Sequence, residues 1–273
     1  MKNHAQAPAI WEVIYDQMRL IYAVVVQKVR KNDRNALVGL MMTVMQTVLL
    51  VGMFYVMFSL LGMRSSAIRG DFVLYLLSGI FLFMTFNATM SAVMGAEGAT
   101  ATMMLHAPLN SVITITASAL AALYTQLLSL SVVLGIYALA WGPITIDDPF
   151  GAASMVLLSW FAGGSVGLVF FAIKPWAPQF ISIIHQIYSR ANMLASGKMF
   201  LANTMPGYII AWFDWNPLFH TIDQARGFTF ANYNPHYSTI AYPLAVSLVL
   251  MVLGMICEYG YRKNASLSWS AGK

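Results

Sequence analysis

Long apolar stretches separated by short polar segments make up most of this chain. A helix that crosses a membrane needs about 20 mostly apolar residues. Charge-poor windows of that length predict spans at residues 36–61, 72–94, 111–141, 152–173 and 239–259. A further window, 178–201, is apolar enough to be a span but contains His185, Arg190 and Lys198. The pattern predicts an all-α chain with five or six spans.

The distribution of basic residues favours six spans over five. Six of the fifteen basic residues precede the first span, and three follow the last one. With six spans both groups lie on the cytoplasmic side together with Lys174, and only Arg64, Arg69 and Arg226 lie outside. Five spans would put the C-terminal basic group outside, against the positive-inside bias of membrane proteins. We therefore predict a six-span domain over residues 36–262, with both termini and the tail 263–273 in the cytoplasm.

The segment before the first span has its own helical pattern. Apolar side chains recur there every three or four residues: Trp11, Ile14, Tyr15, Met18, Ile21, Tyr22 and Val25. Charged residues occupy much of the other side, which is typical of an amphipathic helix lying in the membrane interface. The alternative is an ordinary helix packed against a partner. Residues 1–35 are thus predicted to form a cytoplasmic N-terminus that contains this helix.

Composition and charge agree with an integral membrane protein. The chain is 59% apolar and 9% charged, with a mean hydropathy of +0.68, and a soluble chain of 273 residues carries far more charge. The net charge of +5 follows the predicted topology, so it does not indicate nucleic-acid binding. The single cysteine, Cys257, excludes an intrachain disulfide and a cysteine metal cluster.

The sequence has no recognisable catalytic signature. It lacks a phosphate-binding loop, a zinc-protease helix motif and a nucleophile-histidine-acid pattern, and its five histidines are scattered. We therefore expect neither an enzyme nor a resident cofactor or metal. Gly163 and Gly167 are spaced for close helix approach, and we interpret the pair as structural.

The inner loop between the second and third spans, residues 95–110, is the first candidate functional segment. It begins with small residues and Glu97. An apolar trio, Met103, Met104 and Leu105, comes next and is followed by His106 and Pro108. A short helix that ends at a proline suits docking into a cytoplasmic partner. The alternative is an ordinary connecting loop.

Arg190 is the second candidate, because it lies near the middle of the 178–201 window. A charge at that depth costs about 2.5–3.5 kcal/mol on insertion scales, and no other predicted span has a carboxylate near mid-depth. Arg190 then faces water, meets a partner subunit or binds an anion. Its structural alternative is to cap backbone carbonyls. Lys198 is predicted on the same helix, about 12 Å further along its axis, so that the two cations would line adjacent levels of one cavity; the alternative is that Lys198 extends to the outer interface.

The segment from Arg190 onward also carries a family resemblance. Its order is Arg190, Ser196-Gly197, Phe200, Pro206, Asn216-Pro217-Leu218, Arg226 and an aromatic turn over 228–233. This order resembles the membrane-spanning subunit of type-two ABC exporters of the capsular-polysaccharide and O-antigen branch. DFVLYLLSGI from Asp71 is similar to the family's second-span entry, and MMLHAPLNSV is similar to its coupling loop. The chain departs from the family at Met42, Gln46 and Thr47, and at Leu82-Phe83.

The resemblance implies that residues 203–237 form short re-entrant helices on the outer side, and the prolines there do break the segment into pieces too short to span. It implies a homodimer in the bacterial inner membrane. This homodimer would work with separate ATPase subunits, which bind ATP and magnesium, and with periplasmic and outer-membrane export proteins.

The substrate implied is an acidic, lipid-linked polysaccharide. Expected pathway residues are His185, Arg190, Lys198, Trp212, Trp215, Phe228 and Tyr233. The alternatives are export of O-antigen or a teichoic-acid-type polymer, an ion-coupled secondary transporter and a membrane-bound glycosyltransferase. The second would predict inverted repeats, which the sequence does not display. The third needs paired carboxylates near a membrane surface, and the one adjacent pair, Asp147-Asp148, lies in an outer turn.

Overall fold

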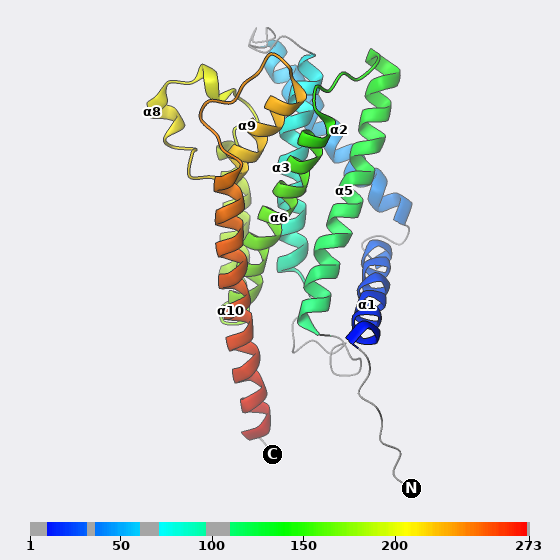
Figure 1. The fold of residues 1–273 in the computed structure, drawn as a ribbon, viewed down its shortest axis with the longest axis vertical. Helices are drawn as coiled ribbons and strands as arrows, with labels where there is room; N and C mark the ends of the chain where they lie inside the picture. The colour runs from blue at the N-terminus through cyan, green and yellow to red at the C-terminus, as the bar shows by residue number, and fades with distance from the viewer. Residues whose placement is uncertain (1–9, 32–35, 61–70, 97–109, 272–273) are drawn as a thin grey trace.

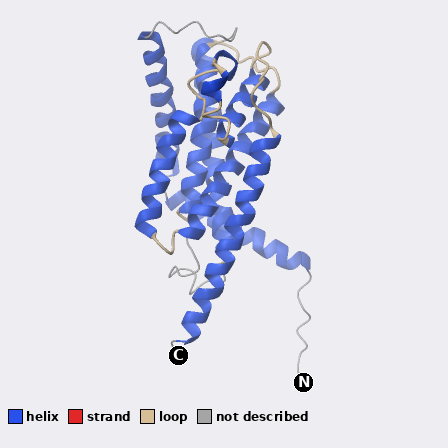
Figure 2. Cartoon of the chain, turned by 90° about the vertical axis from the view of Figure 1, so that its left-hand side faces the viewer, coloured by secondary structure: helices blue, strands red, loops and turns tan. Residues whose placement is uncertain are grey.

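The computed structural model describes residues 10–31, 36–60, 71–96 and 110–271, and these residues are helical with no strand among them (Figures 1 and 2). The long helices are α1 (Ile10–Lys31), α2 (Ala36–Leu60), α3 (Phe72–Met94), α5 (Ser111–Trp141), α6 (Pro149–Ile173), α7 (Pro178–Ala195) and α10 (Ala241–Ala271). Between α7 and α10 lie the 3₁₀ turn η1 (Ala202–Thr204) and two shorter helices, α8 (Gly207–Ile210) and α9 (Pro217–Thr229).

Five helices of the described part are long and apolar enough to cross a membrane. These stretches are Met41–Leu60, Phe72–Met94, Ser111–Ala140, Pro149–Ile173 and Ala241–Lys263. They correspond to five of the predicted spans, so the chain is a multi-pass, all-helical membrane protein in its described part. The predicted boundaries hold for α3 and α5, whereas α6 begins earlier, at Pro149, because Asp148 caps it with its side chain.

The helix predicted over 178–201 is shorter than expected. Helix α7 ends at Ala195, and Gly197 adopts a φ of +72°, a conformation that favours glycine and commonly ends a helix. The prediction that Arg190 and Lys198 lie on one helix is therefore wrong, since Lys198 belongs to the loop after α7. Helix α7 is long enough to be considered, at 18 residues, but it contains too many polar residues to be among the five candidate spans.

Helices α3 and α6 form the centre of the bundle. In the most apolar window of each, 61% of the residues are buried, compared with 22% for α2, α5 and α10. Ser159 donates to the Leu82 carbonyl at 2.8 Å. A Cβ added at Gly163 would lie 2.4 Å from the Phe86 carbonyl oxygen, and one added at Gly167 would lie 2.6 Å from that of Met90. The two glycines therefore allow the helix backbones to touch, which confirms their structural interpretation.

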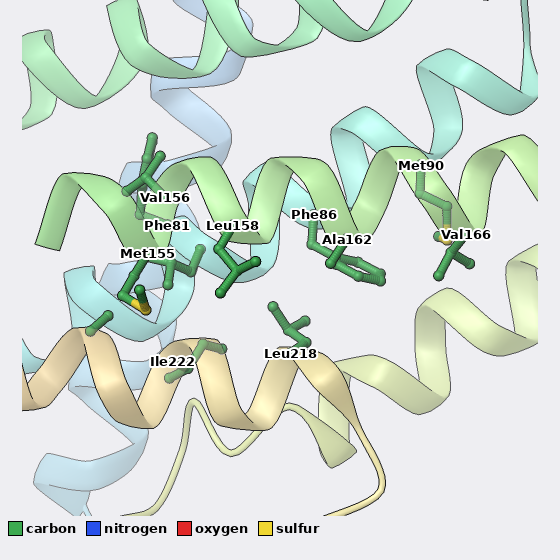
Figure 3. Packing of buried hydrophobic residues seen from close by; sticks show 12 residues of the cluster. Phe81, Phe86, Met90, Met155, Val156, Leu158, Ala162, Val166, Leu218 and Ile222 are labelled. Atoms are coloured by element: carbon green, nitrogen blue, oxygen red, sulfur yellow. The ribbon is translucent and has the colours of Figure 1, made fainter. Parts of the chain in front are cut away.

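Helix α9 packs alongside α6 and continues the core cluster. Figure 3 shows Leu218 opposite Leu158 and Ala162, and Ile222 near Met155. The other end of α9 meets the start of α6, where the Asp148 amide donates to the Phe228 carbonyl at 2.8 Å. Helix α9 thus runs beside an apolar candidate span over its whole length.

Helix α7 connects two opposite ends of the bundle. Helix α1 and the C-terminal end of α10 lie near one end, and α8 and α9 lie near the other (Figure 1). Helix α6 finishes at the α1 end, where Nζ of Lys174 is 3.5 Å from the Met94 carbonyl at the end of α3. Helix α7 therefore carries the chain back toward α8 and α9.

The N-terminal helix has two different apolar faces. Val24 packs with Ile113 and Ala117 of α5, and this contact holds α1 against the bundle. A separate row of apolar and aromatic side chains stays exposed: Trp11, Tyr15, Met18 and Tyr22. Figure 2 shows α1 extending away from the bundle near the end where α10 finishes. The amphipathic helix predicted from the sequence is present.

Candidate functional site: a polar seam between α3 and α7

Polar side chains connect α7 to α3 at successive levels of the bundle. Ser91 Oγ and His185 Nε2 lie 3.2 Å apart, within hydrogen-bonding distance. One turn of α3 further from the α1 end, Ser189 donates to the Asn87 side chain at 2.8 Å. We call Asn87, Ser91, His185 and Ser189 the polar seam. The two helices run antiparallel along it, because the residue number falls on α3 as it rises on α7.

The polar seam lies at the surface of the protomer. Ser91 is exposed, and Asn87, His185 and Ser189 are each half-buried. Asn87 lies about two turns before the end of α3, which is a candidate span, and Ser91 lies in its last turn. Polar groups within the apolar part of a membrane are costly next to lipid and commonly face water or protein. The arrangement is suited to lining a hydrophilic passage.

Arg190 lies next to the polar seam on the outward side of α7. It is exposed, and so are Phe180, Ile183, Ile187 and Leu194 on the same helix. Neither α7 nor α3 contains a carboxylate within its helix. The alternative that Arg190 caps backbone carbonyls inside the protomer is not supported by its exposure.

Lys198 is buried, unlike Arg190. Only 1% of the residue is exposed, and within the described residues its Nζ has no hydrogen-bond partner. The ammonium nitrogen lies 3.3 Å from the centroid of the Phe83 ring and 5.7 Å from that of Phe54. Phe83 belongs to the same face of α3 as Asn87, whose amide donates to the Phe83 carbonyl at 3.0 Å. Lys198 thus lies at the upper end of the polar seam, behind an aromatic ring.

Arg226 caps backbone carbonyls. This is the role that was considered as the alternative for Arg190. Arg226 is 1% exposed and donates to three carbonyls of the loop after α7: those of Gly197, Lys198 and Phe200, at 2.9, 2.6 and 2.7 Å. Its guanidinium carbon lies 4.3 Å from the centroid of the Tyr75 ring. The sequence placed Arg226 in an outer loop and gave no sign that it is buried.

The segment after α7 is also held at the start of α9. The Asn216 side chain donates to the Asn192 side chain at 2.6 Å and to the Ala195 carbonyl at 3.1 Å. Its side-chain oxygen accepts from the Leu218 amide at 3.0 Å, so Asn216 also caps α9. The Asn-Pro motif that carried part of the family resemblance therefore connects the end of α7 with the start of α9.

The four aromatic residues predicted to contact substrate fall into two groups. Trp212 and Trp215 are exposed, with 76% and 57% of their surface accessible. Phe228 is half-buried against the core, and its ring fills the space beside Gly151. Tyr233 is buried. In the protomer, therefore, the two tryptophans are the aromatic residues of this set with rings free for a ligand.

Tyr233 belongs to a buried polar cluster centred on Asp223. The Asp223 carboxylate accepts from the hydroxyls of Tyr233 and Ser238. Burial raises the pKa of the Tyr233 phenol, and the neighbouring Asp223 carboxylate raises it further. The Tyr233 hydroxyl thus uses its hydrogen bond to Asp223 to fix the segment before α10 against α9.

The predicted coupling residues Glu97, Met103, Met104, Leu105, His106 and Pro108 lie outside the described residues. The helix that follows them is described, and its start is fixed to α10. Ser111 donates to the Glu258 carboxylate, and Nη1 of Arg262 donates to the Asn110 side chain at 2.8 Å. The C-terminal half of α10 is therefore tied to the exit of the inner loop.

The described residues contain no group of three or more His, Cys, Asp or Glu side chains placed to hold a metal ion. Comparison with known proteins adds no assignment: no protein-family model matches the chain, and a search of curated proteins found no significant match. The features of this chain that bear on function are therefore the polar seam, the buried cations and the family resemblance of the sequence.

Proposed function

We propose that this chain is the transmembrane subunit of an ATP-driven exporter of acidic polysaccharide in the bacterial inner membrane. In this proposal α7 is the fifth of six crossings, both termini are cytoplasmic, and α8 and α9 are short outer helices that re-enter the membrane. The observation that supports it best is the polar seam with Arg190 beside it. A membrane protein that exposes such groups at depth needs water or polar substrate against them.

The same observation supports a homodimer. The polar seam and Arg190 lie on the surface of one protomer, so one protomer encloses no passage around them. Two copies related by a two-fold axis would present the same face to each other, and most homo-oligomers adopt such closed symmetry. A water-filled passage between two α7 helices would hydrate both arginines and spare them the cost of facing lipid.

The energy source in this proposal is a separate ATPase that binds ATP and magnesium. It would dock on the inner loop, beside the contact of Ser111 with Glu258 and that of Asn110 with Arg262. These contacts join the exit of the loop to α10, so a movement of the loop would reach α5 and α10 together. At the opposite end, Trp212 and Trp215 would stack on sugar rings, because aromatic faces bind the apolar face of a sugar.

Reconstitution tests the proposal. The tagged chain is purified from its native membrane in mild detergent, and we expect an ATP-binding subunit to co-purify with it. Proteoliposomes containing both should then move a fluorescently labelled glucuronate-containing polysaccharide when ATP is present. Replacing Met104 and Leu105 with aspartate should release the ATPase and stop movement. Movement that continues without the ATPase and follows an ion gradient would show a secondary transporter and overturn the proposal.

A further inference from the structure

Lys198 has an unusual environment for a buried cation. An ammonium group has three donors, and within the described residues none of the three is used. Removing such an ion from water is costly, and contacts with aromatic rings offset only part of that cost. The contacts with Phe83 and Phe54 therefore leave the ammonium short of partners.

Lys198 packs close to Arg226. A Cβ placed on Gly79 would lie 3.0 Å from Cβ of Lys198 and 2.9 Å from Nη2 of Arg226, so both side chains approach this glycine. One turn before Arg226 on α9, the Asp223 carboxylate accepts from the hydroxyls of Tyr233 and Ser238. Burial lowers the pKa of the Lys198 ammonium to about 7, and an anion bound beside it would favour the charged form.

Access to the ammonium is controlled by one side chain. Phe83 is only half-buried, so part of it reaches the protomer surface while its ring covers Nζ of Lys198. Asn87 lies four residues further along α3, on the same face, and belongs to the polar seam. A change in the side-chain torsion of Phe83 would open the ammonium toward the polar seam.

We propose that Lys198 is the cation of an anion-binding site at the upper end of the polar seam, and that Phe83 is its cover. The ligand group is a carboxylate or a phosphate, which can accept hydrogen bonds from all three ammonium donors. The proposal deepens the proposed function, because it names the residue that would hold an acidic unit of the passing polymer. Its physical basis, a buried cation without an acceptor, does not depend on that function.

The test is ligand binding to the purified full-length chain in detergent, without any ATPase. Melting temperature is measured against increasing sodium glucuronate, inorganic phosphate or neutral glucose, at constant ionic strength. We expect a saturable rise with at least one of the two anions and none with glucose. The anion with the lower half-saturation concentration identifies the source as a sugar carboxylate or a phosphate.

Two variants assign the binding to this site. Lys198→Met keeps the length of the side chain and should abolish the saturable rise. Phe83→Ala removes the cover and should lower the half-saturation concentration about tenfold, which corresponds to about 1.4 kcal/mol and is within the range of a contact between an aromatic ring and a desolvated cation. The control Arg19→Met removes an exposed cation of α1 and should leave the titration unchanged.

Two results of these titrations would overturn the anion-binding site. No saturable rise in either the wild type or Phe83→Ala would overturn the site and make Lys198 a buried structural amine. An equal rise in Lys198→Met would place the anion elsewhere and would also overturn it. If Lys198→Met does not fold, the tenfold gain in Phe83→Ala remains the deciding measurement. A failure of ATP-driven transport would leave these binding results intact, so the two proposals fail independently.

Discussion

Replacement of Arg226 should be the most destabilising single substitution among the arginines of the described residues. Arg226→Met keeps much of the aliphatic volume but removes three hydrogen bonds to the loop after α7. Hydrogen bonds to charged groups contribute about 1.5–3 kcal/mol each, and part of that sum is returned because a buried cation no longer has to be desolvated. We expect a net loss of about 3–5 kcal/mol, the range found when one partner of a buried charged network is removed.

The assay is thermal unfolding of the purified chain in detergent, followed by tryptophan fluorescence. For a domain of this size 1 kcal/mol shifts the melting temperature by about 2–4 °C, so the expected decrease is about 6–20 °C. Arg226→Lys should recover part of the loss, because an ammonium keeps the charge but cannot reach three carbonyls with the same planar geometry.

Arg190→Met is the matched control, since it makes the same chemical change on the exposed side of α7. It should leave the melting temperature unchanged or raise it, because exposed substitutions usually change stability by about 0.5 kcal/mol or less. A melting temperature for Arg226→Met within about 2 °C of the wild type would refute the capping role of Arg226. An equal decrease in both variants would assign the effect to lost positive charge and not to the carbonyl contacts.

Three further predictions follow from other contacts. Gly163→Ala should destabilise the chain by about 1–3 kcal/mol through a clash with the α3 backbone, whereas the neighbouring Gly164→Ala, with 3.6 Å of room, should be tolerated in the same melting assay. The raised pKa of Tyr233 means that its stabilising contribution is complete below about pH 10, its unfolded-state pKa, and is lost as the pH rises above it. Tyr233→Phe should therefore lose less stability between pH 9 and pH 11 than the wild type, and identical pH profiles would contradict this. In a Cys257→Ser background, Tyr208→Cys should react with a membrane-impermeant thiol reagent added outside the cell; reaction only from the cytoplasmic side would show that α7 does not cross.

The sequence predicted five of the spans because a membrane requires long apolar stretches, and these can be recognised in a single sequence. Every span must satisfy its backbone internally and present apolar side chains, so windows such as that of α3 stand out from hydropathy alone. The end of α7 was also within reach of sequence reasoning. Gly197 stands just after Ala195, at a position where glycine commonly ends helices, and its φ of +72° fits that role.

The roles of the buried cations could not be predicted in this way. Hydropathy cannot tell whether an arginine near an outer turn stays in water or reaches three carbonyls in another segment. Arg226 and the loop at Gly197 are far apart in the sequence, and they meet only because Asn216 joins α9 to the end of α7. The sequence analysis singled out Arg190 and Lys198 in this part of the chain as pathway residues, and that role stays a prediction. Carbonyl capping was the alternative interpretation for Arg190, which is exposed, whereas Arg226, expected in an outer loop, is the residue that caps carbonyls.

The contacts at the two ends of α9 have a mechanical consequence. Asn216 fixes its first turn to α7, and the amides of Asp147 and Asp148 donate to the carbonyls of Thr229 and Phe228 at its other end. Helix α9 is therefore held at both ends. An outward movement of α9 alone would break the backbone hydrogen bonds to Asp147 and Asp148, just before α6. The upper parts of α6, α7 and α9 should instead move as one rigid body, so that in the proposed homodimer an opening for a polymer would form along the boundary between the two protomers.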